Sequence, residues 1–206
     1  MAQKYSVQDG DSIASIAKKN GYLWKTIWDH PDNAELKRKR KDPNVLKAGD
    51  EVTLPDPVIK EESRPTGKRH TFVRKGEPTK LKLKLARFGK ARSGVKYQLI
   101  VDGTKFEGTT DGSGKIEHFI PGDSRQAKLI VDGKETTIKI GHLDPADDVS
   151  GAQQRLRNLG YDCGGEEGEI GERTQRALES FQHANGLQTS GKLDSQTVDK
   201  LKATHG

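Results

Sequence analysis

Two stretches near the N-terminus decide the fold: residues 5–30, YSVQDGDSIASIAKKNGYLWKTIWDH, and residues 42–55, DPNVLKAGDEVTLP. The first opens with residues 5–7, which predict a short strand before an Asp-Gly-Asp turn. The second ends with residues 51–54, a predicted strand that Pro55 terminates. Because the sequence between these strands has helical periodicity, the segment predicts a small module with the order strand, helix, helix, strand.

Two helices are predicted between the strands. Ser12 can cap the first, whose apolar residues recur at helical spacing (Ile13, Ile16 and Ala17) and which Asn20-Gly21 ends. The second has an apolar face made of Leu23, Trp24, Ile27 and Trp28. Trp24 and Trp28 share one side of that helix. Such a pair more often belongs to a core than to a sugar platform, although one residue can serve as both.

This segment resembles a LysM domain, the small module that binds glycans containing N-acetylglucosamine, such as peptidoglycan and chitin. The resembling residues are Tyr5, Val7, Gly10, Asp11, Ser12, Ile13, Ile16, Ala17, Asn20, Gly21, Asn44, Leu46, Gly49, Asp50, Leu54 and Pro55. The resemblance implies a βααβ fold over residues 1–56. It also implies a glycan site between the loop after the first strand and the loop before the last.

The glycan site implied by the resemblance consists of two short runs: Gly10, Asp11, Ser12 and Ile13, and Asn44, Val45 and Leu46. Gly10 lets the backbone approach a sugar, so that main-chain groups can meet its acetamido group. Ile13, Val45 and Leu46 offer apolar surface to a pyranose face. The alternative is that Asp11 and Ser12 only cap the helix and that Leu46 belongs to the core.

An insert from Pro31 to Lys41 departs from the family pattern, which has a short loop there. The insert can cover or extend the glycan groove. Its residues 37–41, KRKRK, are typical of a nucleic-acid patch, of a localisation signal or of a solvated loop beside Glu35 and Asp42. We favour the solvated loop, because short basic runs are mostly surface.

The middle of the chain changes to a β pattern. Residues 57–68 combine proline with charge and predict a linker. From 69 to 141 the sequence shows about seven short strands, such as Lys80–Leu85, and Asp-Gly turns between strands. This pattern predicts an antiparallel β-sandwich. The string from Tyr97 to Pro121 resembles immunoglobulin-like or transthyretin-like modules found beside injection-system spike proteins. Alternatively, the lysines of the first strand only guard an exposed edge.

Residues 142–206 return to helical periodicity and predict a three-helix bundle. Asp148 and Asp194 are expected to cap the first and last helices. This tail is similar to the peptidoglycan-binding domain often appended to wall hydrolases. The matching residues are Val149, Gln153, Leu156, Leu159, Gly160, Tyr161, Gly168, Ile170, Gly171, Thr174, Ala177, Leu178, Phe181, Gln182, Asn185, Gly186, Leu187, Gly191, Leu193, Asp194 and Thr197.

The candidate ligand contacts of this tail are polar groups near the start of the middle helix: Glu169, Gly171, Thr174, Gln175 and Gln182. Here the N–H groups of a helix N-terminus, together with an amide or a hydroxyl, can bind a stem peptide or a sugar. The alternative is that Thr174 only caps or packs.

Composition fits several small modules better than one thick core, because hydrophobic residues make up 31% and charged residues 32% of the chain. Residues 80–141 have thirteen basic and seven acidic residues, whereas residues 142–206 have seven and eleven. The central positive field attracts anionic wall polymers, acidic proteins or nucleic acid alike. No transmembrane run or secretory signal is visible. We therefore expect synthesis in the cytoplasm, no membrane insertion, and action at the wall or periplasm or within an injection apparatus.

No catalytic centre is expected. Cleavage of peptidoglycan needs an activated water or nucleophile, and the sequence has no HExxH motif, no GxSxG elbow and no suitable Cys–His spacing. The lone Cys163 excludes an internal disulfide and fits a semi-buried loop residue better than a nucleophile. Since the six histidines are spread over the chain, no metal site and no cofactor are predicted. The sequence favours a non-catalytic peptidoglycan binder.

Two other functions are weighed against that hypothesis. One is a structural adaptor of a contractile injection system or phage tail, whose LysM and helical folds contact spike or baseplate proteins. The other is nucleic-acid binding through the central basic field. Because no aromatic–basic interleaving supports it, we expect no specific nucleic-acid partner.

Overall fold

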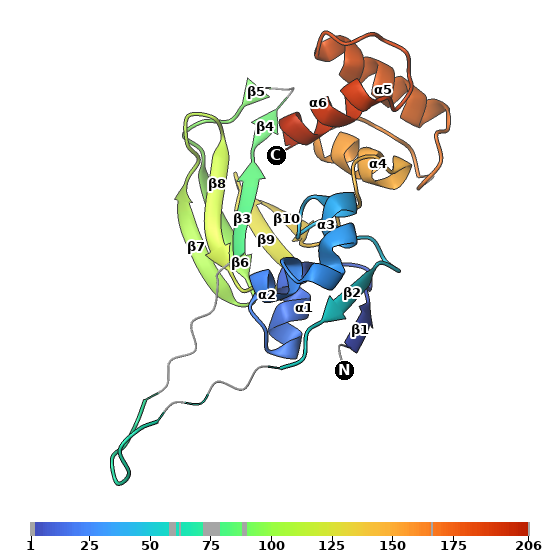
Figure 1. Ribbon diagram of the computed structural model, residues 1–206. Coiled ribbons are helices and arrows are strands. Elements are labelled where there is room, and N and C mark those ends of the chain that lie inside the picture. Colours follow the sequence, from blue (N-terminus) through green and yellow to red (C-terminus); the bar gives the residue numbers. More distant parts are fainter. Residues whose placement is uncertain are drawn as a thin grey trace.

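The computed structural model describes residues 3–57, 61, 63–71, 79–87, 90–165 and 167–205. Figure 1 shows three modules: an N-terminal module (residues 3–55), a β module (79–141) and a C-terminal helical module (142–205). The N-terminal module contacts both of the others, through ion pairs described below. The chain is therefore a multidomain α+β protein, as its sequence predicts.

The N-terminal module has the predicted order of strands and helices. β1 (Gln3–Ser6) pairs antiparallel with β2 (Glu51–Leu54), and α1 (Ile13–Asn20) and α2 (Trp24–Trp28) lie between them in the chain. Apolar side chains from α1, α2, β2 and the segments between the elements form one core: Val7, Ile13, Ile16, Ala17, Ile27, Trp28, Leu36, Leu46, Val52 and Leu54. Trp24 packs against the same core, so both tryptophans have a structural role.

Ser12 caps α1 as predicted. Its hydroxyl accepts a hydrogen bond from the Ser15 N–H at 3.1 Å, and Ser15 Oγ accepts one from the Ser12 N–H at 3.0 Å. This reciprocal capping box satisfies two N–H groups that the helix leaves without an internal partner.

The insert folds into the 3₁₀ helix η1 (Pro31–Asn33) and the helix α3 (Ala34–Arg40). The expectation of a loop is therefore wrong, whereas the expectation that the basic run is largely solvated is confirmed. The run becomes helical because Leu36 is buried in the core and Arg40 forms a two-point ion pair with Asp50, with Nε–Oδ2 and Nη2–Oδ1 distances of 2.7 and 2.8 Å. Lys37, Arg38 and Lys39 stay exposed.

Asn33 fastens the insert to the last strand of this module. The side chain is only 1% exposed. Its amide nitrogen donates to the carbonyls of Ile27 at 2.9 Å and Thr53 at 2.8 Å, and its oxygen accepts from the Thr53 N–H at 2.8 Å. One amide thus joins α2, η1 and β2.

The β module is a sandwich, as predicted. A four-stranded sheet in the order β10-β9-β6-β7 faces a two-stranded ribbon of β3 and β8, and β4 and β5 form a short hairpin. The strands are β3 (Thr79–Lys84), β4 (Ala86–Arg87), β5 (Lys90–Ala91), β6 (Lys96–Val101), β7 (Thr104–Thr109), β8 (Lys115–Ile120), β9 (Gln126–Val131) and β10 (Lys134–Lys139). All pairs are antiparallel. Leu99, Val101 and Leu129 from the sheet meet Ile116 and Ile120 from the ribbon in one core.

The C-terminal module contains α4 (Val149–Asn158), α5 (Glu172–Ala184) and α6 (Ser195–His205). Asp194 caps α6 as predicted, with Oδ1 accepting from the Thr197 N–H at 2.8 Å. Asp148 precedes α4, but the predicted cap is wrong because its side chain makes no capping hydrogen bond. Its carboxylate instead lies 2.6 Å from Lys47 Nζ in the N-terminal module.

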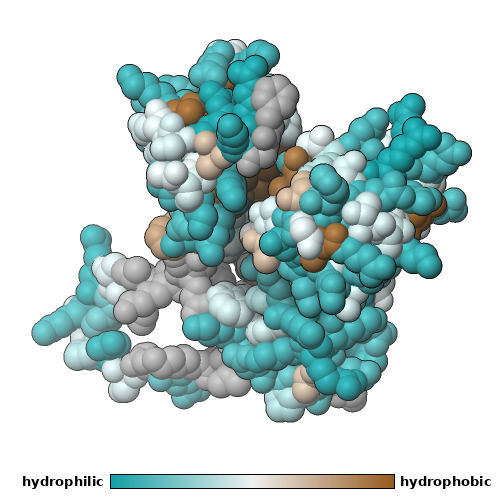
Figure 2. Space-filling view, turned by 90° about the horizontal axis from the view of Figure 1, so that it is seen from above, coloured by the Kyte–Doolittle hydropathy of each residue, from teal (hydrophilic) through white to brown (hydrophobic). Residues whose placement is uncertain are grey.

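The surface is strongly polar. Seen from above, it is mostly hydrophilic, with apolar side chains only in small patches (Figure 2). Within the described ranges, no helix is long and apolar enough to cross a membrane.

The Asn33 clamp generates a stability prediction. Asn33→Ala leaves the partly buried Thr53 N–H and the carbonyls of Ile27 and Thr53 without the Asn33 amide, so we expect the N-terminal module to lose about 3 kcal/mol of unfolding free energy. Both tryptophans of the chain lie in this module, so tryptophan fluorescence during urea unfolding reports on it selectively. Asn44→Ala, at an exposed position, is the matched control. Equal unfolding midpoints for the two variants would show that the clamp contributes nothing.

Acid should weaken the same module. Burial alone would raise the pKa of Asp50, but hydrogen bonds from Arg40 and from the Lys47 N–H hold it below its ordinary value of 3.8. Because the pKa is lower in the folded than in the unfolded protein, the charged carboxylate stabilises the fold at pH values above the unfolded pKa. This contribution is lost as the pH falls through the folded pKa.

We therefore expect the urea midpoint to fall between about pH 5 and pH 3, and to fall less in Asp50→Asn than in the wild type. Asp29→Asn, which removes an exposed carboxylate paired with Lys37, is the control. A wild-type pH dependence in Asp50→Asn would contradict this assignment.

Candidate functional site

The two runs expected to hold a glycan lie side by side. The Ile13 N–H donates to the Pro43 carbonyl at 2.9 Å, which joins the loop before α1 to the loop before β2. Ile13 and Leu46 are 0% and 5% exposed and belong to the core. Asn44 is exposed and Val45 is half-buried, so these two residues are the accessible part of the second run.

Asp11 organises the first run. Its carboxylate accepts hydrogen bonds from Tyr5 Oη at 2.9 Å, from the Gln8 N–H at 3.0 Å and from Ser15 Oγ at 3.3 Å. A further bond comes from the β module, where Arg125 Nη2 lies 2.6 Å from Asp11 Oδ1. Burial alone would raise the pKa of Asp11, but these hydrogen bonds, led by that of Arg125, hold it below its ordinary value. The carboxylate is therefore a charged anchor between two modules.

The loop around Asp11 is covered by Arg125 of the β module and by His142, the first residue of the C-terminal module. Gly10 is buried, and a Cβ atom at this position would lie 2.9 Å from the His142 ring. His142 Nδ1 also lies 3.3 Å from an Asp9 carboxylate oxygen, and Lys18 pairs with Asp123. The space beside the Gly10 backbone, which the resemblance assigns to a sugar, is thus occupied by protein side chains in this structure.

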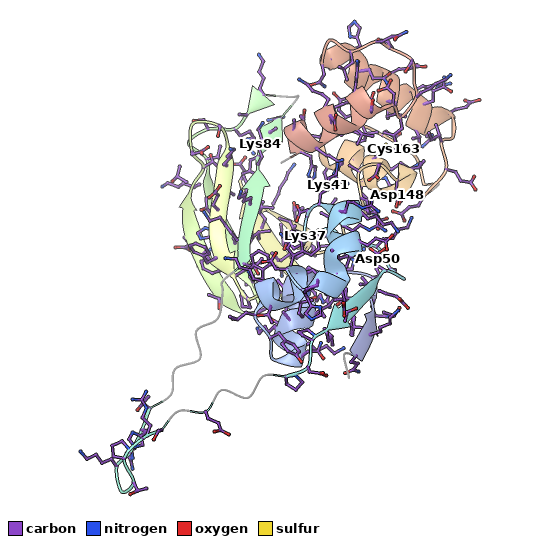
Figure 3. The ribbon with its side chains drawn as sticks, in the orientation of Figure 1. Lys37, Lys41, Asp50, Lys84, Asp148 and Cys163 are labelled. Atoms are coloured by element: carbon purple, nitrogen blue, oxygen red, sulfur yellow. The ribbon has the colours of Figure 1, made fainter. Side chains whose placement is uncertain are left out.

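The second run borders the C-terminal module. Lys47, which follows Leu46 directly, pairs with Asp148 at the start of α4 at 2.6 Å. Figure 3 shows Asp148 close to the end of the N-terminal module that carries Asp50 and Lys41. Both loops of the expected glycan site are therefore contacted by a neighbouring module, and Asn44 and Val45 form the part that stays accessible.

In the C-terminal module, Gln182 is buried and fully engaged. Its Oε1 accepts from the N–H groups of Ser190 and Gly191, both at 2.9 Å. Its Nε2 donates to the Lys192 carbonyl and to Thr197 Oγ1, also both at 2.9 Å. Gln182 thus shapes the loop between α5 and α6 from within.

Thr174 has a similar internal role. It is 2% exposed; its hydroxyl donates to the Cys163 carbonyl at 3.1 Å and accepts from Gln153 Nε2 at 2.8 Å. Gln153 is fully buried and also accepts from the Gly168 N–H at 2.9 Å. Sequence reasoning did not assign this role to Gln153, although a glutamine at an apolar-periodic helix position is a signal for it.

The accessible candidates lie around a shallow surface pocket of about 380 Å³. It is lined by apolar Val149, Ile170 and Leu193 and by polar Asp147, Gln175, Ser190, Gly191 and Lys192. Gln175, one of the five predicted contacts, is exposed here, and Glu169 and Gly171 flank Ile170 in the chain. Ile170 is 45% exposed, so this module presents an apolar side chain among hydrogen-bonding groups. That combination suits a sugar or a short peptide.

Cys163 does not have the environment of a nucleophile. Its thiol is buried among α4 and the loop before α5, and burial raises its pKa. A raised pKa keeps the thiol protonated at neutral pH and therefore weakly reactive. Within the described part of the chain, no group of three or more His, Cys, Asp or Glu side chains could hold a metal ion.

Comparison with known proteins assigns the two end modules. Residues 5–55 match the model of the LysM domain, and residues 145–201 match that of a peptidoglycan binding domain. No curated protein and no solved structure matches the chain. Both matched families are binding domains rather than catalytic ones. The chain therefore joins a LysM domain and a peptidoglycan binding domain, one on each side of an antiparallel β module.

Proposed function

We propose that this protein binds peptidoglycan through both end modules without cleaving it, and thereby anchors or positions itself or a partner on the cell wall. The observation that carries the proposal is the presence of two different wall-binding domains in one chain. The LysM domain would hold the glycan near Asn44 and Val45. The C-terminal domain would hold a second feature of the polymer, a stem peptide or a sugar, in the pocket beside Ile170 and Gln175.

The arrangement of the modules supports bivalent binding. The LysM domain is tied to the β module by Asp11–Arg125 and to the C-terminal domain by Lys47–Asp148, so both sites belong to one docked body. When two weak sites are linked and both can be occupied, overall affinity exceeds that of either site by about 10²- to 10⁴-fold. A polymer with repeated features is a suitable ligand for such a pair.

Each site can be tested separately with a charge placed in it. Val45→Asp places a charge beside the expected sugar face, and Ile170→Asp does the same in the C-terminal pocket. In sedimentation with purified insoluble peptidoglycan, we expect each variant to bind about tenfold or more weakly, and the double variant to remain in the supernatant. Leu23→Asp, at a 48% exposed position that belongs to neither set of site residues, is the matched control. If the double variant sediments like the control, neither site binds the wall.

The role of the covered loop around Asp11 can also be tested. If the glycan also uses residues 10–12, the β module must move away first, and the apparent affinity is reduced by the fraction of molecules in which the loop is free. Arg125→Ala removes the strongest contact and should therefore strengthen binding of chitooligosaccharides several-fold, measured by calorimetry. Lys128→Ala, which breaks an exposed pair with Glu135 in the same module, should have no effect. Weaker binding by Arg125→Ala would show that the docked arrangement is the binding form.

A second candidate function is a structural adaptor of a contractile injection system or phage tail. The covered loop favours it, because the face that LysM domains offer to glycans already contacts protein through Arg125 and His142. An adaptor of this kind should co-elute with a spike or baseplate protein encoded beside it in size-exclusion chromatography and should fail to sediment with peptidoglycan. The opposite pair of results would favour the wall binder.

A further inference from the structure

The outer face of the ribbon formed by β3 and β8 carries side chains that the end modules do not explain. Its exposed positions alternate along the two strands: Lys80, Lys82 and Lys84 on β3, and Lys115, Glu117 and Phe119 on β8. The residues between them, such as Leu81 and Ile116, face the sandwich core. The ribbon therefore has one apolar face and one basic face that is open to solvent.

The exposed face of the two strands carries more positive than negative charge, with four lysines and one glutamate. The strand register places Lys84 directly opposite Lys115, and like charges in that position destabilise a strand pair. Glu117 lies opposite Lys82 in the same register and pairs with Lys80 at 3.0 Å. Among the residues that the structure describes, no carboxylate lies within ion-pair distance of Lys82, Lys84 or Lys115. Lys84 lies at the end of β3 nearest to β4 (Figure 3).

Phe119 adds an exposed aromatic ring to this face. It is 60% exposed, more than the other large exposed apolar residues of the described surface, Leu23 and Ile170. Lys80 Nζ lies 5.3 Å from the ring centroid, a cation–π contact that holds the ring beside the lysines. Guarding of an edge strand accounts for the lysines alone, because an exposed ring promotes the edge association that lysines prevent.

We propose that this face of the β module binds an acidic polysaccharide. The Phe119 ring would pack against a sugar ring, while Lys82, Lys84 and Lys115 contact carboxylate or phosphate groups along the polymer. Charge complementarity selects a polyanion. A sugar polymer fits better than nucleic acid, since single-stranded nucleic acids are held by several stacking rings and by arginine, whereas this face has one ring and only lysines. The proposal does not depend on either end module.

The test uses the full chain and polygalacturonate oligosaccharides, a soluble polymer of carboxylated sugars, in titration calorimetry. We expect about tenfold weaker binding for Phe119→Ala and for the double variant Lys82→Gln/Lys84→Gln, and weaker binding by the wild type when salt rises from about 50 to 200 mM. The double variant Lys134→Gln/Lys139→Gln on β10 removes the same charge elsewhere in the module and should bind within twofold of the wild type. All substituted positions are exposed, so melting followed by circular dichroism should be unchanged.

Four results would overturn the proposal. The first two are a wild type that does not bind polygalacturonate and a wild type that binds neutral dextran equally well. The third is a loss of affinity in the β10 control as large as in the two variants of the ribbon face, which would indicate a diffuse charge effect. The fourth is tighter binding of a single-stranded oligonucleotide through the same residues, which would make the face a nucleic-acid site. Sedimentation of these variants with peptidoglycan should match the wild type, so a failure here is distinguishable from a failure of the end-module sites.

Discussion

One buried carboxylate sets the arrangement on which the N-terminal half depends. Asp11 accepts hydrogen bonds from Tyr5, Gln8 and Ser15 within its own domain and from Arg125 in the β module. A buried charge is tolerated only when its acceptor sites are filled, so the local loop and the neighbouring module stabilise each other. The same interaction shapes the loop expected to meet a glycan and covers it with the β module.

Buried polar side chains also fix the loops in the rest of the LysM domain and in the C-terminal domain. Asn33 joins the insert to β2, and Gln153 and Gln182 each hold a loop of the C-terminal domain from within. Hydrophobic residues make up only 31% of the chain, so its small cores leave long connections to be fixed by hydrogen bonds. The residues that remain accessible to a ligand lie at the surface of these hydrogen-bonded loops, such as Val45 and Ile170.

Local patterns predicted the elements of this fold well, because helices, strands and caps depend on residues near in sequence. Ser12 and Asp194 are helix caps, as their positions predict. The failures involve tertiary contacts. The basic run is helical where a loop was expected, because Leu36 is buried in the core and Arg40 pairs with Asp50. Asp148 does not cap α4 because Lys47, 101 residues earlier, takes its carboxylate. No sequence pattern could show that Arg125 covers Asp11. Thr174 and Gln182 are internal through contacts within their own module, whereas Gly10 is covered through contacts with the other modules.

The two wall-binding domains are unequal in their readiness to bind. The C-terminal pocket beside Ile170 is open, whereas the LysM loop around Asp11 is covered by Arg125 and His142. Under the proposed function, the open pocket would engage the wall first, because it requires no rearrangement. Attachment there would raise the local glycan concentration beside the LysM domain, and the gain in effective concentration would offset the free energy of breaking Asp11–Arg125. Tight binding would then require a polymer that presents both features within reach of one chain.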